Sequence, residues 1–259
     1  MIDVVVDDGQ TKVINKGIER PLAKREKKWL KDQELAPDLK IDVICWPEQE
    51  EHYMAYMPQT DNIYIFGGTY NELDKGNTDM IGLGASHEVE HAIYFRLDKD
   101  RQMAVGSAVA GLVEKDEEAK IIFKDFVKKL YARPGGDYLK KHQFGNSEVK
   151  IEKDGSKPGL KDGRWLRVEV DDTGKKENLY LGLVTTELFS YMEMGNHPEL
   201  CEGETLDNIS ARELVETAQA FKVKIESDTK THEAIKQGGN LGMSRAVSDM
   251  GRFIEFSNE

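Results

Sequence analysis

The sequence has few cysteines and no long hydrophobic segment. Only Cys45 and Cys201 are cysteines among its 259 residues, which excludes a disulfide scaffold, although two cysteines suffice for one bridge. No apolar run approaches the roughly 20 residues that cross a bilayer, so we expect no membrane segment and no membrane partner. The N-terminus, MIDVVVDDGQ, carries acids where a signal peptide begins with a basic segment. We therefore expect a cytoplasmic protein, or one exported without a cleavable signal peptide.

Basic residues are outnumbered by acidic ones. The chain has 36 Lys and Arg against 48 Asp and Glu, which gives a net charge of -12 at pH 7. Contacts to phosphates need clustered Lys and Arg, so we expect no nucleic acid among the partners. Solubility explains the negative charge, with a surface for a basic partner as the alternative.

The length and composition predict one large domain. A chain of 259 residues with 39% hydrophobic residues can bury a sizeable core. We expect residues 1–259 to form a single domain of the α+β class. From about 144 to 183 the sequence is polar, rich in β-forming residues and punctuated by glycine, which predicts an inserted β-hairpin or small sheet.

The spacing of apolar residues predicts the other elements. Two β-rich runs, at 52–58 and 62–68, are joined by a short polar connection and predict an antiparallel hairpin. Two further strands are expected at 2–6 and 39–46. Helices are expected at 17–35, 79–95, 104–113, 116–136, 185–194 and 210–225.

The stretch MIGLGASHEVEHAIYF, residues 80–95, contains the order His-Glu-x-x-His within an otherwise apolar or small-residue helix. His87 and His91 are four positions apart, so a helix presents both imidazoles on one face. Zinc accepts such a pair, and Glu88 can hold a water molecule on the open side of the metal. A structural helix face is the alternative, but buried polar groups need partners, and a metal would provide one.

A catalytic zinc site normally has three protein ligands, so a third ligand is needed. The remaining histidines are candidates by type, but the His-x-x-Gly-x-x-His continuation of the metzincins is absent. They are His52, His142, His197 and His232. Carboxylates are the better source, and the segments 113–120 and 184–194 compete.

The second carboxylate segment is favoured by its surroundings. Glu187 lies in an apolar sequence that we expect to begin a helix capped by Thr185 or Thr186, and charged residues are rarely buried without a partner. Glu117 and Glu118 belong to a charged run, for which water is a sufficient partner. We therefore predict Glu187 as the third metal ligand.

The two segments SHEVEHAI and TTELFSYMEM, with NHPEL downstream, resemble the zincin-like metallopeptidase domains of phage minor-head proteins and bacterial polymorphic toxins or effectors. These gluzincin-type domains carry His-Glu-x-x-His after an antiparallel edge strand, and later a helix that opens Thr-Glu-x-x-Ser. Ser190 matches the serine of that motif, and Asn196 with Pro198 approximates the later segment. A glycine usually precedes the second histidine in the family, whereas Glu90 stands there in this chain.

The resemblance implies a zincin-like fold and a zinc metallopeptidase. His87, His91 and Glu187 would bind Zn²⁺, and Glu88 would act as general base on a zinc-activated water. Tyr191, one turn after Glu187, is a candidate donor to the oxyanion, with core packing as the alternative. The resemblance implies a protein or peptide substrate, and its toxin members imply an inhibitor or immunity partner. Two alternatives remain open: a metal-stabilised binding or structural module, and a hydrolase of other bonds.

Overall fold

A computed structural model describes part of the chain. The described residues are 6–7, 12–15, 42–46, 54–69, 79–133, 139–140, 165–196 and 209–238. The contacts divide the chain into two compact units, the first made of residues 1–92 and 197–207 and the second of residues 93–196 and 208–259. The predicted helix at 17–35 lies outside the described residues. The prediction of a single domain is not tested by this division.

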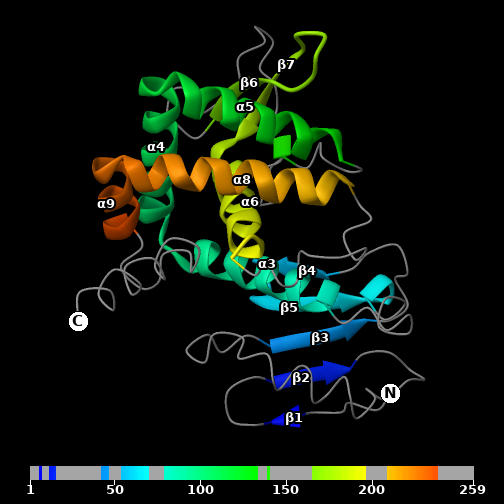
Figure 1. The fold of residues 1–259 in the computed structure, drawn as a ribbon. Helices are drawn as coiled ribbons and strands as arrows, with labels where there is room; N and C mark the ends of the chain where they lie inside the picture. Colours follow the sequence, from blue (N-terminus) through cyan, green and yellow to red (C-terminus); the bar gives the residue numbers. More distant parts are fainter. Residues whose placement is uncertain are drawn as a thin grey trace, which may run out of the picture. The chain divides into compact units, whose positions relative to one another are not determined.

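The first unit contains a five-stranded mixed sheet (Figure 1). Its strands are β1 (Val6–Asp7), β2 (Lys12–Asn15), β3 (Asp42–Trp46), β4 (Met54–Met57) and β5 (Asn62–Phe66). Their order is β1-β2-β3-β5-β4, and β4 is antiparallel to β5. The predicted antiparallel hairpin is thus confirmed, and among the described strands β4 forms one edge of the sheet.

The centre of this sheet is parallel, which the sequence analysis did not predict. Strand β3 pairs in parallel with β2 on one side and with β5 on the other. The parallel pair β2 and β3 is joined by the long connection 16–41, as parallel neighbours require. The pair β3 and β5 is parallel because the antiparallel strand β4 lies between them in the sequence. The described residues form both helices and sheets, which agrees with the predicted α+β class.

Helix α3 (Asp79–Arg96) carries the His-Glu-x-x-His stretch and confirms the helix predicted at 79–95. Its residues up to Ala92 belong to the first unit, and those from Ile93 belong to the second. The corner after α3 is held by Gln102, whose side-chain amide donates to the Leu97 carbonyl oxygen at 2.8 Å. Asp98 then caps the following helix by accepting a hydrogen bond from the Arg101 N–H at 2.9 Å.

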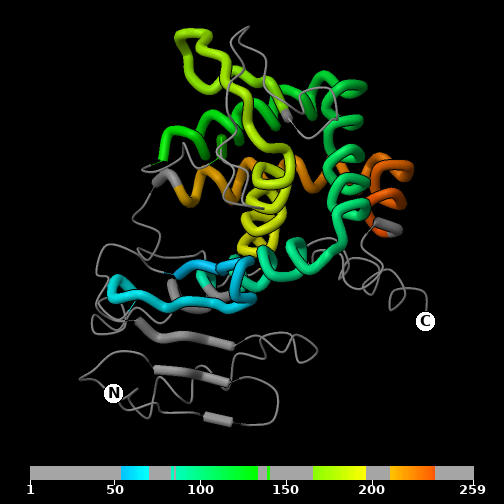
Figure 2. The backbone as a smooth tube through the Cα atoms, turned by 180° about the vertical axis from the view of Figure 1, so that it is seen from behind, coloured from blue at the N-terminus to red at the C-terminus, as the bar shows by residue number. Residues whose placement is uncertain are grey.

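The second unit is mainly helical. Its elements are α4 (Lys99–Lys115), α5 (Glu117–Ala132), β6 (Trp165–Glu169), β7 (Lys176–Tyr180), α6 (Leu181–Met194), α8 (Ile209–Ser227) and α9 (Thr229–Gly238). Every residue of α6 except Gly182 is buried, and the helix contacts α4, α8 and β7 (Figure 2). Aromatic side chains fill the space around it, since Phe126 packs against Tyr191 and Phe123 against Phe221. Helix α6 is therefore the core of this unit.

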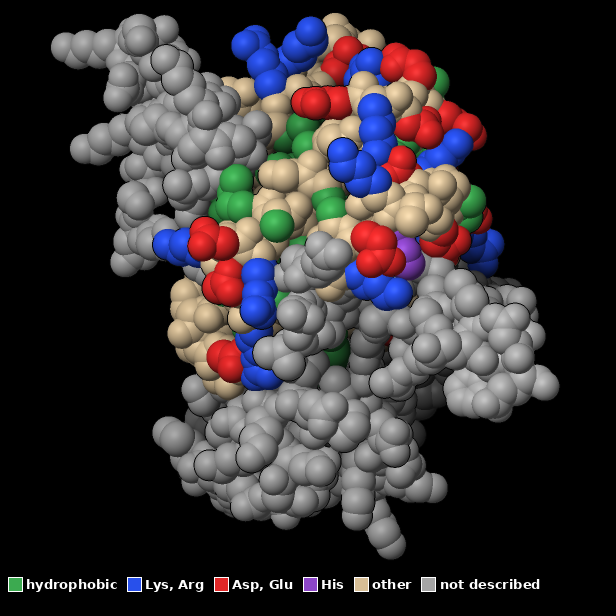
Figure 3. Space-filling view, turned by 90° about the vertical axis from the view of Figure 1, so that its left-hand side faces the viewer, with side chains coloured by type: hydrophobic (Ala, Val, Ile, Leu, Met, Phe, Trp, Pro, Cys, Tyr) green, Lys and Arg blue, Asp and Glu red, His purple; other side chains and the backbone are tan. Residues whose placement is uncertain are grey.

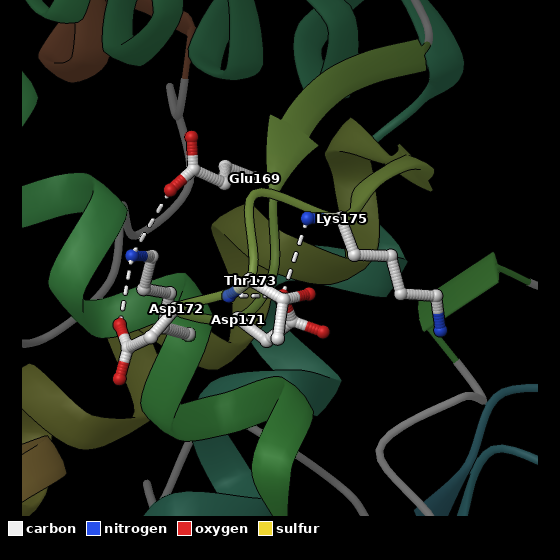
Figure 4. A network of polar contacts seen from close by, with 6 residues as sticks. Glu169, Asp171, Asp172, Thr173 and Lys175 are labelled. Atoms are coloured by element: carbon white, nitrogen blue, oxygen red, sulfur yellow. Dashed lines mark hydrogen bonds and ion pairs between the residues drawn. The ribbon is translucent and has the colours of Figure 1, made fainter.

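The predicted β-rich insertion contains the antiparallel hairpin β6–β7. Asp171 organises its turn by accepting hydrogen bonds from Thr173 and from the Lys175 N–H, and the Thr173 hydroxyl is the main cause that lowers the pKa of Asp171 (Figure 4). Gly174 follows with φ of 81°, a conformation that suits glycine. The predicted end of the insertion, at about 183, lies inside α6, which begins at Leu181. Residues 144–164 of the insertion lie outside the described residues.

The surface of the described helices carries charges of both signs. Ion pairs join Lys120 to Glu117 and Lys129 to Asp125, each within one helix turn. On the face drawn in Figure 3, acidic and basic side chains are intermixed and hydrophobic side chains form only small patches. None of the helices in the described part of the chain has the length and hydropathy needed to span a bilayer.

Candidate metal centre

Helix α3 passes close to the edge strand β4 of the same unit. A Cβ atom on Gly84 would lie 3.2 Å from the Met54 sulfur, so the glycine permits this approach. One turn later, Glu88 Oε2 accepts a hydrogen bond from the Tyr56 main-chain N–H at 2.6 Å. Gly84 therefore lets α3 approach β4 closely, and Glu88 reaches the edge of the sheet.

The two histidines of the motif converge as the helical spacing predicts. The Nε2 atoms of His87 and His91 are 3.1 Å apart, and their rings meet edge to face with centroids 4.7 Å apart. His91 is buried and His87 is half-buried. The side chains are thus close enough to share either one proton or one cation.

The donor set fits a zinc ion. Two nitrogens that bind one tetrahedral zinc at 2.0–2.1 Å lie about 3.3 Å apart, close to the spacing of this pair. Glu88 offers a carboxylate oxygen, and the ligand atoms of the three residues all lie within 4.8 Å of one another. Two imidazoles and a carboxylate are also the ligand types that zinc and similar transition metals prefer.

This group stands alone within the described residues, where no other set of three His, Cys, Asp or Glu side chains is placed to hold a metal ion. Comparison with protein-family models, curated proteins and solved structures gives no match for this chain. The functional argument therefore rests on the residues and their geometry.

Glu187, the predicted third ligand, lies on α6 in the second unit. The sequence analysis was wrong about the start of this helix, because α6 begins at Leu181 and Tyr180 occupies its N-cap position without a side-chain cap. Thr185 and Thr186 are instead buried in the helix interior. Glu187 is buried, with 8% of its surface exposed. Its role as a ligand stays a prediction.

The competing carboxylates have the solvated environment that the sequence indicated. The side chain of Glu117 is 74% exposed and pairs with Lys120. That of Glu118 is 69% exposed and pairs with Lys224 of α8. Both acids are thus supplied with water and a cation, as the charged run in the sequence indicated.

Tyr191 is held within the second unit by packing and hydrogen bonding. Its ring lies edge-on to Phe126, with centroids 6.0 Å apart. Its hydroxyl accepts a hydrogen bond from the Arg133 guanidinium, which also lies 5.7 Å from the ring centroid. These contacts favour the core-packing alternative over the oxyanion donor.

Of the other candidate histidines, His232 is half-buried on α9 in the second unit. His52, His142 and His197 lie outside the described residues. Tyr56 was not among the predicted site residues. It contacts Glu88 through its main chain, and a main-chain contact leaves no side-chain pattern in a sequence.

Proposed function

We propose that the protein is a zinc-dependent metallopeptidase of zincin-like type. The main support for the proposal is the distance of 3.1 Å between the Nε2 atoms of His87 and His91. Glu88 lies beside them, within the same cluster. The position of this helix after an antiparallel edge strand adds support, because an extended peptide can pair with such an edge.

The roles proposed for the residues follow from their chemistry. His87 and His91 would hold the zinc through their ring nitrogens, with Glu187 as the proposed third ligand. When bound, zinc would polarise the scissile carbonyl and lower the pKa of a bound water. Glu88 would accept a proton from that water and return it to the leaving amine. We include a toxin or effector role, with an inhibitor or immunity partner, only as an implication of the sequence resemblance.

A structural module is the second candidate, and the histidine pair itself gives it a basis. One neutral imidazole can donate to the other at the observed distance, which would satisfy the two facing Nε2 atoms without a metal. This candidate predicts a protein that folds normally without zinc and hydrolyses no peptide.

Replacement of Glu88 by Gln tests the proposal. The variant should keep about one zinc per chain and lose at least about 100-fold in peptidase activity, the lower range for loss of a general base. Elemental analysis and incubation with casein and with cell lysate measure the two properties. Glu118→Gln, an exposed acid to amide change, is the matched control and should retain both. Wild-type protein that folds normally without zinc and cleaves nothing would favour the structural module.

A further inference from the structure

The contact between Glu88 and the main chain of Tyr56 is not part of the ligand set. It joins helix α3 to the edge strand β4 across 32 residues of sequence, and it is buried. A hydrogen bond between a carboxylate and an N–H group is stronger than one between two neutral groups. It therefore fixes the position of one Glu88 oxygen relative to the sheet.

The direction of this N–H group follows from the strand pairing. Among the described strands, β4 pairs with β5 alone, with Ala55 opposite Tyr64 and Tyr56 opposite Ile63. Main-chain groups of successive residues point to opposite sides of a strand. Because the Tyr56 N–H reaches Glu88, it points away from β5, and the N–H groups of the flanking residues point toward β5.

We propose that the Tyr56 main-chain N–H is a positioning group for Glu88, an inference that rests on the proposed peptidase function. The N–H holds Oε2 and thereby fixes the orientation of the carboxylate that would exchange a proton with water. The same contact links the base to the strand along which an extended peptide would lie. Since this N–H is already used, the peptide would pair with β4 through its other outward main-chain groups.

The alternative is that the bond only docks α3 against β4. A docking role predicts effects on stability and none on turnover. A positioning role predicts a lower kcat with KM and zinc content unchanged, because Glu88 would remain present but incorrectly oriented. The two roles therefore differ in a kinetic property that can be measured.

A single proline substitution at position 56 separates the two roles. Tyr56→Pro removes the N–H, and an edge strand tolerates proline where the N–H points outward. Tyr56→Ala is the matched control, since it also lacks the ring and keeps the N–H. We expect kcat on a casein-derived peptide to be at least 10-fold lower in Tyr56→Pro than in Tyr56→Ala, within the range known for residues that orient a metal site. Equal kcat values in the two variants would overturn the proposal.

A second substitution covers the case in which the proline variant does not fold. Replacement of the residue by its α-hydroxy acid turns the N–H into an ester oxygen and keeps the tyrosine side chain. The ester protein should show the same loss of kcat, with zinc content and KM within about two-fold of wild type. Full turnover by the ester protein would refute a positioning role.

Amide hydrogen exchange tests the contact independently of activity. In the metal-free protein, the Tyr56 amide should exchange slowly in wild type and in Glu88→Gln, because both side chains can accept the bond. It should exchange at least 10-fold faster in Glu88→Ala, while the Ile63 and Tyr64 amides remain unchanged. Equal exchange of the Tyr56 amide in all three proteins would disprove the contact. If the contact is present and wild type cleaves no peptide, the proposed function fails and the positioning role fails with it.

Discussion

Helices α3 and α6 both bury ionisable side chains, but they arrange them differently. In α3, the ligand atoms of His87, Glu88 and His91 converge within 4.8 Å. In α6, Tyr191 lies one turn after Glu187, and its hydroxyl accepts a hydrogen bond from Arg133. The buried polar residues of α6 are thus spread along the helix, whereas three polar residues of α3 converge at one point.

The C-terminal end of α6 shows how the second unit satisfies a buried acid. Glu193 accepts a hydrogen bond from the Asn196 amide at 2.9 Å. The Asn196 oxygen in turn accepts one from the Lys222 ammonium at 2.6 Å. A positive charge at this end of a helix is favourable to its dipole. Buried polarity is therefore a weak sign of a site by itself, and convergence of ligand atoms is the stronger sign.

The largest expected effect is the loss of zinc when the two histidines of α3 are replaced. His87→Ala combined with His91→Ala should reduce the zinc content from about one ion per chain to none, because both nitrogen ligands are lost. Elemental analysis after zinc-supplemented expression and dialysis measures the content. His232→Ala on α9 is the control and should leave it unchanged. Stoichiometric zinc in the double variant, or none in the wild type, would contradict the metal centre.

A second substitution asks whether α6 contributes to the metal centre. Glu187→Ala should weaken zinc binding by at least about 10-fold. Loss of a group that only supports a ligand already costs about 10-fold or more, so loss of a ligand should cost at least as much. Glu187→Gln should do the same while preserving the volume of the side chain, which separates loss of a ligand from formation of a cavity. Competition with a chromogenic chelator measures the affinity.

The control for that experiment uses the exposed acids of α5. Glu117→Ala with Glu118→Ala should change zinc affinity by less than about two-fold, since both side chains are mostly exposed and ion-paired. The reverse pattern, with a large loss in the α5 variant and none at Glu187, would move the third ligand to α5. It would also remove the main support for the resemblance to zincin-like domains.

The sequence predicts the local features of the site better than its surroundings. The bounds of α3 and the hairpin of β4 and β5 follow from helical spacing and from turn residues, which are local signals. The start of α6 was missed because Leu181, Leu183 and Val184 form a short apolar run, and such a run fits a strand as well as a helix. The parallel pairing of β3 depends on how strands far apart in the sequence are ordered in the sheet, and that order leaves no periodic signal in the strands themselves.

The smallest expected effect concerns Tyr191 and separates packing from catalysis in α6. Tyr191→Phe removes only the hydroxyl that accepts from Arg133, so the free energy of unfolding should fall by about 1.5–3 kcal/mol, as for a hydrogen bond to a charged group. Peptidase kcat should stay within about two-fold of wild type, because the hydroxyl is already bonded inside the second unit. Denaturant unfolding and steady-state kinetics measure the two quantities.

A double-mutant cycle then identifies the partner. Arg133→Met removes the other half of the hydrogen bond and retains much of the side-chain volume, so it should destabilise the protein by a similar amount. Because the two groups contact each other, the combined Tyr191→Phe and Arg133→Met variant should lose less stability than the sum of the single changes. Additive losses would show that the pair does not interact. A loss of about 100-fold in kcat in Tyr191→Phe, with stability unchanged, would instead give the hydroxyl a role in catalysis and bring α6 into the chemistry that α3 is proposed to perform.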